Sequence, residues 1–215
     1  MTRGYFVTVD GPSGVGKSTT IAELHRHLTA RGINAVLTTE PPRTALGTFT
    51  RQHAGEIRGF SLACLVAAAR YEHVEQTIMP ALQEKRLLIS DRYLASTLAL
   101  QRLDGVPLDF LLDINRHAPN PDLAVILTAS PEEISERIAR AGVTHRFRGD
   151  PEGPVRELRF YDEAAVALEE RGVDVMRLDS STATPSEVAG RIADAITNRR
   201  LLSVLSQALP TPRES

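Results

Sequence analysis

The stretch Gly11-Pro12-Ser13-Gly14-Val15-Gly16-Lys17-Ser18, followed by Thr19, decides the fold of this chain. It matches the G-x-x-x-x-G-K-S/T pattern of a phosphate-binding loop (P-loop), and it lies between an apolar run, Tyr5 to Val9, and a helix-like stretch that begins at Lys17. Glycines let the backbone fold tightly around phosphate oxygens, and the N-terminal end of the following helix attracts negative charge. We therefore predict that this loop binds ATP, with Lys17 at the β- and γ-phosphates and Ser18 on Mg²⁺.

Five short apolar runs predict the strands of a sheet. They are Tyr5 to Val9, Ala35 to Thr39, Leu87 to Ser90, Leu123 to Thr128 and Val173 to Leu178. The runs are near-continuous rather than alternating, which is typical of strands covered on both faces. Capping residues and apolar spacing predict helices over Lys17 to Ala30, Ser61 to Gln83 with a kink at Pro80, Leu108 to His117, Pro131 to Ala141, Pro154 to Glu170 and Pro185 to Ala208. The alternation indicates an α/β fold with a parallel sheet, as a single domain over residues 1–208 with a flexible tail at 209–215.

Composition limits the class of function. The 215 residues include 25 basic and 27 acidic side chains, and the formal charge of −2 gives no reason to expect binding to nucleic acid or to a membrane surface. No apolar run is long enough to span a membrane, and the first residues lack the apolar core of a signal peptide, so we expect a cytoplasmic protein. Cys64 is the only cysteine, and its apolar neighbours predict that it is buried.

An acid and a base follow the third predicted strand directly. Asp91 and Arg92 come after Leu87 to Ser90, at the carboxyl end of a parallel strand, where open α/β sheets bind ligands. Asp91 is placed to contact Mg²⁺ or to orient the attacking oxygen, and Arg92 to hold an acceptor phosphate. A plain surface ion pair is the alternative.

Further arginines indicate a second anion site and a lid. Arg70 lies on the predicted helix Ser61 to Gln83 after three alanines, and Arg43 follows Glu40-Pro-Pro in the loop after the second strand. Arg137, Arg140, Arg146 and Arg148 lie on and after the predicted helix Pro131 to Ala141. An arginine-rich loop at about 141–153 that closes over the migrating phosphoryl group would supply charge and exclude water.

The chain resembles the thymidylate kinases over roughly residues 4 to 195. The matching residues are the P-loop, Thr39-Glu-Pro-Pro-Arg-Thr-Ala-Leu-Gly47, Arg70, Ile78-Met-Pro-Ala-Leu82, Asp91-Arg-Tyr-Leu-Ala-Ser96, Gln101, Pro121-Asp122, Pro131-Glu132 and Arg137. The resemblance implies a nucleoside-monophosphate-kinase fold with strand order 2-3-1-4-5, a helical cap over the acceptor, a lid loop, and a homodimer formed through helices.

This resemblance also implies roles for individual residues. It puts Arg92 and Arg43 near the acceptor phosphate, Arg70 and Gln101 near the base, Ser96 in the base pocket, Tyr93 along the acceptor site and Arg137 against the adenine of ATP. The P-loop has no arginine between its glycines, which is similar to the subclass whose catalytic arginine comes from the lid. Arg146, helped by Arg140 or Arg148, would then donate the charge.

Three positions depart from the family pattern. Val66 stands where the family has a phenylalanine that stacks on thymine, Ser13 where it has an acid that binds the sugar 3′-hydroxyl, and Leu100 where it has tyrosine. The changes weaken contacts with the nucleoside and leave the phosphate contacts in place, so we expect poor use of dTMP.

Three functions remain open from the sequence. The first is a nucleotide kinase that acts on dTMP or a related small nucleotide. The second is a kinase on the same scaffold whose acceptor is a modified nucleotide or another phosphorylated metabolite. The third is a regulatory P-loop protein without a small acceptor, for which a second anion site would be useless.

Overall fold

The computed structural model describes residues 3–141 and 152–208. Its strands are β1 (Tyr5–Asp10), β2 (Ala35–Thr39), β3 (Leu87–Asp91), β4 (Leu123–Thr128) and β5 (Val175–Asp179). Its helices are α1 (Lys17–Ala30), α2 (Ala45–His53), α3 (Gly59–His73), α4 (Met79–Gln83), α5 (Leu94–Leu100), α6 (Leu108–Ile114), α7 (Pro131–Ala141), α8 (Gly153–Glu170) and α9 (Pro185–Ala208). A π-helical turn, Val74–Ile78, joins α3 to α4, and a 3-10 turn, Arg102–Asp104, follows α5. Among the described helices, none combines the length and the apolarity that crossing a membrane requires.

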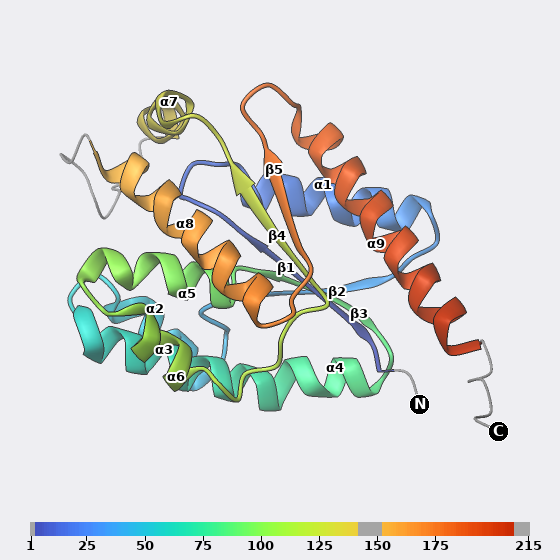
Figure 1. The fold of residues 1–215 in the computed structure, drawn as a ribbon, viewed down its shortest axis with the longest axis horizontal. Coiled ribbons are helices and arrows are strands. Elements are labelled where there is room, and N and C mark those ends of the chain that lie inside the picture. The colour runs from blue at the N-terminus through green and yellow to red at the C-terminus, as the bar shows by residue number, and fades with distance from the viewer. Residues whose placement is uncertain (1–2, 142–151, 209–215) are drawn as a thin grey trace.

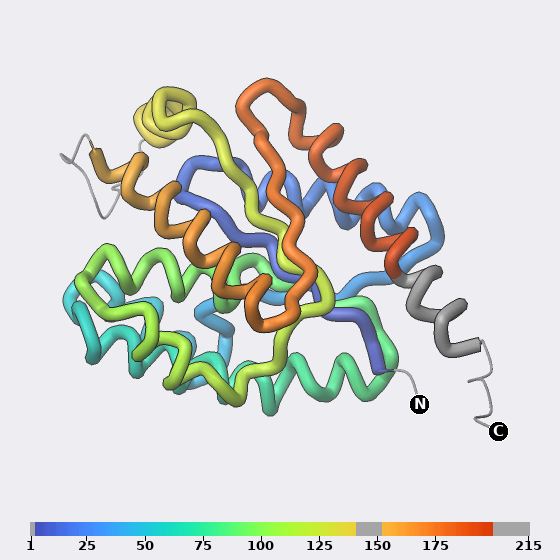
Figure 2. The backbone as a smooth tube through the Cα atoms, viewed as in Figure 1, coloured from blue at the N-terminus to red at the C-terminus, as the bar shows by residue number. Residues whose placement is uncertain are grey.

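The five strands form one parallel sheet in the order β2-β3-β1-β4-β5. The parallel α/β sheet predicted from the sequence is confirmed, as is the strand order that the resemblance implies. Because the chain moves to one side of β1 for β2 and β3 and to the other for β4 and β5, a crevice opens at the carboxyl ends of the central strands. The P-loop leaves β1 at that end of the sheet (Figure 2).

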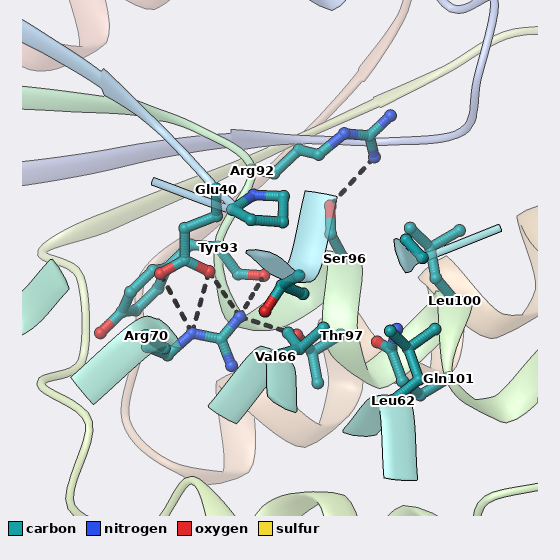
Figure 3. A pocket seen from close by; sticks show the side chains of 13 residues that line it. Glu40, Leu62, Val66, Arg70, Arg92, Tyr93, Ser96, Thr97, Leu100 and Gln101 are labelled. Atoms are coloured by element: carbon teal, nitrogen blue, oxygen red, sulfur yellow. Dashed lines mark hydrogen bonds and ion pairs between the residues drawn. The ribbon is translucent and has the colours of Figure 1, made fainter. Parts of the chain in front are cut away.

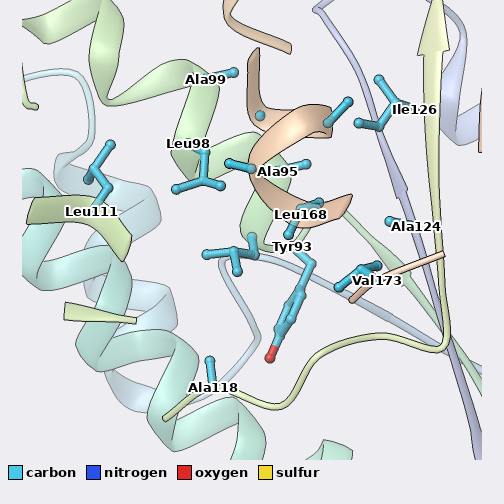
Figure 4. Packing of buried hydrophobic residues seen from close by; sticks show 14 of the residues in the cluster. Tyr93, Ala95, Leu98, Ala99, Leu111, Ala118, Ala124, Ile126, Leu168 and Val173 are labelled. Atoms are coloured by element: carbon cyan, nitrogen blue, oxygen red, sulfur yellow. The ribbon is translucent and has the colours of Figure 1, made fainter. Parts of the chain in front are cut away.

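Helices cover both faces of the sheet, and neighbouring residues of one strand pack on opposite faces. In Figure 1, α1 and α9 lie side by side on one face, while α5 and α8 lie together on the other. Phe6 of β1 belongs to the core under α5 and α8, part of which Figure 4 shows, whereas Val7 belongs to the core under α1 and α9. Leu88 and Ile89 of β3 alternate in the same way. Burial on both faces is the reason that the strands are near-continuous apolar runs.

Several predicted boundaries differ from the structure. β1 and β3 are one residue longer than predicted, so each ends on an acid, Asp10 or Asp91. β5 begins at Val175 instead of Val173. The prediction for α6 was too long, because the helix ends at Ile114, after which the side chain of Asn115 turns back and donates to a helix carbonyl.

The predicted helix Ser61 to Gln83 is three segments. α3 begins two residues earlier, and the π-helical turn Val74–Ile78 precedes Pro80, whose ring lacks an N–H and clashes with the carbonyl four residues before it in a regular helix. Helices α2 and α5 were not predicted at all. The prediction that Cys64 is buried was wrong, because it lies on the outer side of α3 and is exposed.

Candidate active site

The P-loop conformation requires its glycines. Gly11, Gly14 and Gly16 have φ of 143°, 79° and 94°. A Cβ at Gly11 would lie 2.4 Å from the carbonyl oxygen of Leu127, and one at Gly14 would lie 2.8 Å from Ile138 of α7. Because only glycine adopts these angles without strain and leaves this space, the loop can pass close to its neighbours and still aim its amides at a ligand.

Lys17 lies inside the P-loop. Its ammonium donates to the carbonyl oxygens of Gly11 at 2.8 Å and Pro12 at 2.7 Å. Burial lowers the pKa of Lys17 to about 7, with a further contribution from Arg92, while Asp91 opposes the shift. The charge on this lysine therefore responds to its surroundings near neutral pH, and anionic phosphates beside it would favour the charged form.

Ser18 and Asp91 make an oxygen pair that suits Mg²⁺. The Ser18 hydroxyl donates to Oδ2 of Asp91 at 3.2 Å. The other oxygen, Oδ1, is buried and has no hydrogen-bond partner among the described residues. In the described part of the chain no cluster of three or more His, Cys, Asp or Glu could hold a metal alone. Magnesium fits such a site, because it is commonly bound by one or two protein oxygens together with water and phosphate oxygens.

Arg92 stands between two cavities. It lines a cavity of 250 Å³ together with Ser96 and Gln101, and it also lines the 400 Å³ P-loop cavity together with Lys17 and Asp91. Its φ of 71° is unusual for a residue with a side chain, and conformations of this kind cluster at functional sites. Arg92 can therefore contact a ligand group that lies where the two cavities meet.

Contacts on both sides hold Arg92 in this conformation. Its backbone N–H donates to Val9, its carbonyl accepts from Ser90, and its guanidinium donates to Ser96 and to the phenol of Tyr161, both at 3.4 Å. Burial alone would lower the pKa of Arg92, but Tyr161 and nearby carboxylates, Asp91 foremost among them, raise it. Arg92 is thus a fixed cation at the junction of the two cavities.

The 250 Å³ cavity brings together most of the residues that the resemblance assigns to the acceptor, and it is called the acceptor pocket below. Its walls are Glu40, Pro41, Thr50, Ala54, Leu62, Val66, Arg70, Arg92, Tyr93, Ser96, Thr97, Leu100 and Gln101 (Figure 3). Val66, Leu62 and Leu100 form apolar wall, and the ring of Tyr93 is packed edge-on against Phe6 instead of lying open to the cavity. Gln101 is buried, and its side-chain amide has no recorded partner among the described residues. Gln101 is therefore a polar side chain of this pocket that is available to a ligand.

Arg70 is bound inside the protein. It is 1% exposed, and its guanidinium donates to Glu40, to Asn115 at 2.6 Å, to Thr97 at 2.7 Å and to the carbonyl of Tyr93 at 3.2 Å. Glu40 accepts from Nη2 at 2.6 Å and from Nε at 3.0 and 3.2 Å (Figure 3). One hydrogen of Nη1 has no recorded partner among the described residues, so at most one donor is left for a ligand.

The other predicted arginines lie apart from this pocket. Arg43 is exposed on a neighbouring cavity of 640 Å³, which it shares with Ser18 and Asp91. Arg137 lines the P-loop cavity, where it donates to Val15 O at 3.3 Å and to Ser180 O at 3.0 Å. Arg140 points into solvent and pairs with Glu136 at 3.6 Å. Arg146 and Arg148 lie outside the described residues, as does most of the predicted lid.

Two buried residues of α8 were missed by the sequence analysis. Glu157 is 1% exposed, and its Oε1 accepts from the backbone N–H of Ser13 at 3.3 Å. Tyr161, one helical turn later, is fully buried, and its phenol contacts Ser96 at 3.1 Å as well as Arg92. The available signal was the i, i+4 spacing of two polar residues on the face that continues through Ala164, Ala165 and Leu168.

Asp10 was also missed. It ends β1 and is fully buried, and its Oδ1 accepts from the N–H of Tyr93 at 2.9 Å and from the N–H and hydroxyl of Ser96 at 2.9 and 2.6 Å. Burial raises the pKa of Asp10, and these hydrogen bonds oppose the shift. Asp10 thus fixes the start of α5, which carries Ser96 into the acceptor pocket.

Together these features define a P-loop kinase with a separate pocket for a small anionic acceptor. Comparison with known proteins narrows the class, because the family model described as thymidylate kinase matches residues 9–171. The chain is 37% identical over 153 residues to a probable thymidylate kinase of Pyrococcus horikoshii, a match that covers 67% of this chain and 75% of that relative. It is 38% identical over 141 residues to a thymidylate kinase of Xanthomonas oryzae pv. oryzae, with 65% of this chain and 62% of the relative covered. The chain belongs to the thymidylate kinase family, whose members are ATP-dependent nucleoside monophosphate kinases.

Proposed function

We propose that this enzyme transfers the γ-phosphoryl group of ATP to dTMP or a related nucleoside monophosphate, with Mg²⁺ at Ser18 and Asp91. The observation that carries the proposal is the position of Arg92, on the wall of both the acceptor pocket and the P-loop cavity. A phosphate held there would lie between the nucleoside in one cavity and the triphosphate in the other. That arrangement brings nucleophile and electrophile together, which is most of what phosphoryl transfer requires of a protein.

Different positively charged groups bind the triphosphate and the acceptor phosphate. Lys17 and the P-loop amides bind the triphosphate, and Arg92, supported by Tyr161, holds the acceptor phosphate. Bound Mg²⁺ supplies positive charge that helps the β- and γ-phosphates separate. Arg137 would lie against the adenine, and the lid arginines Arg140, Arg146 and Arg148 would supply charge to the migrating group, with Arg146 as the main donor.

The acceptor pocket favours a nucleoside without strong stacking. Gln101 can hydrogen-bond the edge of a base, whereas Val66 and Leu100 offer only aliphatic surface. Stacking a base on an aromatic ring contributes about 1–3 kcal/mol, and its loss predicts weak binding of dTMP. This wall supports the second candidate function, phosphorylation of a modified nucleotide or another phosphorylated metabolite. A regulatory protein without a small acceptor fits neither this second pocket nor the family.

One assay tests the proposal. ADP release is measured with MgATP and a panel of nucleoside monophosphates, followed by sugar phosphates. Saturable, acceptor-dependent ADP release with a nucleoside monophosphate is the expected result. Release with sugar phosphates alone would favour the second candidate, and release with no acceptor would refute both.

We also infer that two copies pair through the outer face of α2 and α3. Leu46, Phe49 and Phe60 are 39%, 45% and 53% exposed, and Cys64 of α3 is also exposed. Phe60 is anchored edge-on against Phe110 with ring centres 4.8 Å apart, so this surface is stiff as well as apolar. Exposed large apolar side chains on two helices that pack together are a feature of protein interfaces.

A further inference from the structure

We propose that Glu157 accepts a hydrogen bond from a sugar hydroxyl of the acceptor and is a specificity-determining residue. This inference rests on the proposed function, because it assumes a nucleoside monophosphate in the acceptor pocket. Four observations about the described residues carry it: the burial of Glu157, its incomplete set of partners, its position, and its sign of charge.

Glu157 is a buried carboxylate with few partners. Among the described residues only the backbone N–H of Ser13 donates to it, at 3.3 Å, and it is 1% exposed. A carboxylate offers about four lone-pair sites, so within the described part of the chain most of its capacity to accept hydrogen bonds is unused. Burial raises the pKa of Glu157, and the attraction of Lys17 and Arg92 opposes this only in part. A buried acid whose charge does not stabilise the fold is a candidate for function.

Glu157 lies beside the P-loop and near Arg92. It touches the P-loop through Ser13, and it is close enough to Lys17 and Arg92 for each to influence its pKa. Tyr161, one turn further along α8, contacts both Arg92 and Ser96, which line the acceptor pocket. α8 therefore places an acid against the P-loop and, one turn later, a phenol against two residues of the acceptor pocket wall.

The negative charge of Glu157 determines which group of the acceptor this residue can bind. An ionised carboxylate only accepts hydrogen bonds, so it repels the acceptor phosphate and attracts a hydroxyl. In the proposed function Gln101 contacts the base and Arg92 the phosphate, and the sugar of a nucleoside monophosphate connects the two. In dTMP the one free hydroxyl on this sugar is the 3′-hydroxyl.

The test compares two acceptors that differ in this hydroxyl. For wild type and Glu157→Gln we would measure kcat/KM at saturating MgATP with dTMP and with its 3′-deoxy form, together with the KM for ATP. Glu157→Gln should lower kcat/KM for dTMP about ten- to a hundredfold, as expected for one hydrogen bond to a charged group, and change the 3′-deoxy acceptor less than about threefold. Glu170→Gln, an exposed acid at the end of the same helix, is the matched control and should change neither.

A second variant distinguishes binding of the acceptor by Glu157 from a purely structural role of this residue. Ser13→Asp in the Glu157→Gln background returns a carboxylate to the same corner from the P-loop, and it should recover part of the activity on dTMP alone. Because burial raises the pKa of Glu157, the amide should leave the melting temperature unchanged or higher at pH 8.

Each outcome has one meaning. Equal losses on both acceptors, a loss confined to the KM for ATP, or a lower melting temperature without acceptor preference would make Glu157 a structural support of the P-loop and overturn the inference. If wild type prefers another monophosphate, the same pair is made from that acceptor and its deoxy form. If wild type phosphorylates no nucleoside monophosphate, the proposed function fails and this inference with it.

Discussion

The buried ion pair between Arg70 and Glu40 predicts a loss of stability whose size can be calculated. Glu40→Gln keeps the shape of the side chain and removes its charge. Arg70 is 1% exposed and would lose the carboxylate that accepts three of its hydrogen bonds, at 2.6, 3.0 and 3.2 Å. Burial by itself lowers the pKa of Arg70, and Glu40 more than restores it, so Glu40 is the main compensation for this buried charge.

Removal of one member of a buried ion pair destabilises a protein by about 3–5 kcal/mol, because the other charge is left without compensation. Asn115 and Thr97 still bind the guanidinium, which favours the lower end of that range. At about 2–4 °C per kcal/mol for a chain of this length, the melting temperature should fall by roughly 6–20 °C. Thermal unfolding followed by circular dichroism measures this, with Glu169→Gln as the control, since Glu169 pairs with Arg177 on the surface and should matter little.

The double variant, Glu40→Gln with Arg70→Met, separates stability from recognition of the acceptor. It removes both charges, so it should be more stable than either single variant. If the remaining Nη1 hydrogen of Arg70 donates a hydrogen bond to the acceptor, the folded double variant should show a raised KM for the acceptor with a similar kcat. A fall of less than about 1 kcal/mol in Glu40→Gln would refute the reasoning, since ordinary exposed pairs contribute that much.

Three further predictions concern the P-loop, the acceptor pocket and the interface. Because burial lowers the pKa of Lys17 to about 7 and bound phosphates favour its charged form, ATP binding should take up a proton above that pH and weaken by up to about tenfold per pH unit. Calorimetry in buffers of different ionisation enthalpy measures the uptake, and its absence would contradict the assignment. Val66→Phe should lower the KM for dTMP about five- to a hundredfold by adding a stacking surface, with kcat preserved; steady-state kinetics showing no change would mean that the base lies elsewhere. Phe60→Asp should convert a dimer to a monomer in analytical ultracentrifugation, and a monomeric wild type would refute the interface.

The sheet and the phosphate site could be predicted because their signals are local. A strand buried on both faces is an apolar run, and the P-loop pattern occupies eight consecutive residues, Gly11 to Ser18. The missed helices lack such signals. Every residue of α5 from Leu94 to Ala99 is buried, so no polar face marks a helical period. α2 has nine residues, including a glycine and two threonines, which favour helix weakly.

The nucleoside half of the site could not be predicted in the same way, because tertiary contacts assemble it. The N–H of Ser13 and the carboxylate of Glu157 are 144 positions apart in the sequence, and Arg70 is 30 positions from Glu40. A pattern in the sequence identifies which side chains are charged, but not which charges meet. The expectation that Arg70 lies near the base did not include Glu40, which takes up most of its donors.

Contacts between distant residues also change how the departures at Ser13 and Val66 should be interpreted. Each was weighed from the sequence as a loss at its own position, yet the structure brings an acid, Glu157, to within hydrogen-bonding distance of the Ser13 backbone. With the role proposed for Glu157, a carboxylate added at position 13 in the wild type would meet a like charge in a buried corner, so Ser13→Asp alone should not improve dTMP use. No recorded contact offers a similar substitute for the stacking ring, since Tyr93 is held against Phe6. The loss at Val66 therefore remains the stronger reason to expect an acceptor other than dTMP, and the two positions, which looked equivalent in the sequence, should respond differently to reversal.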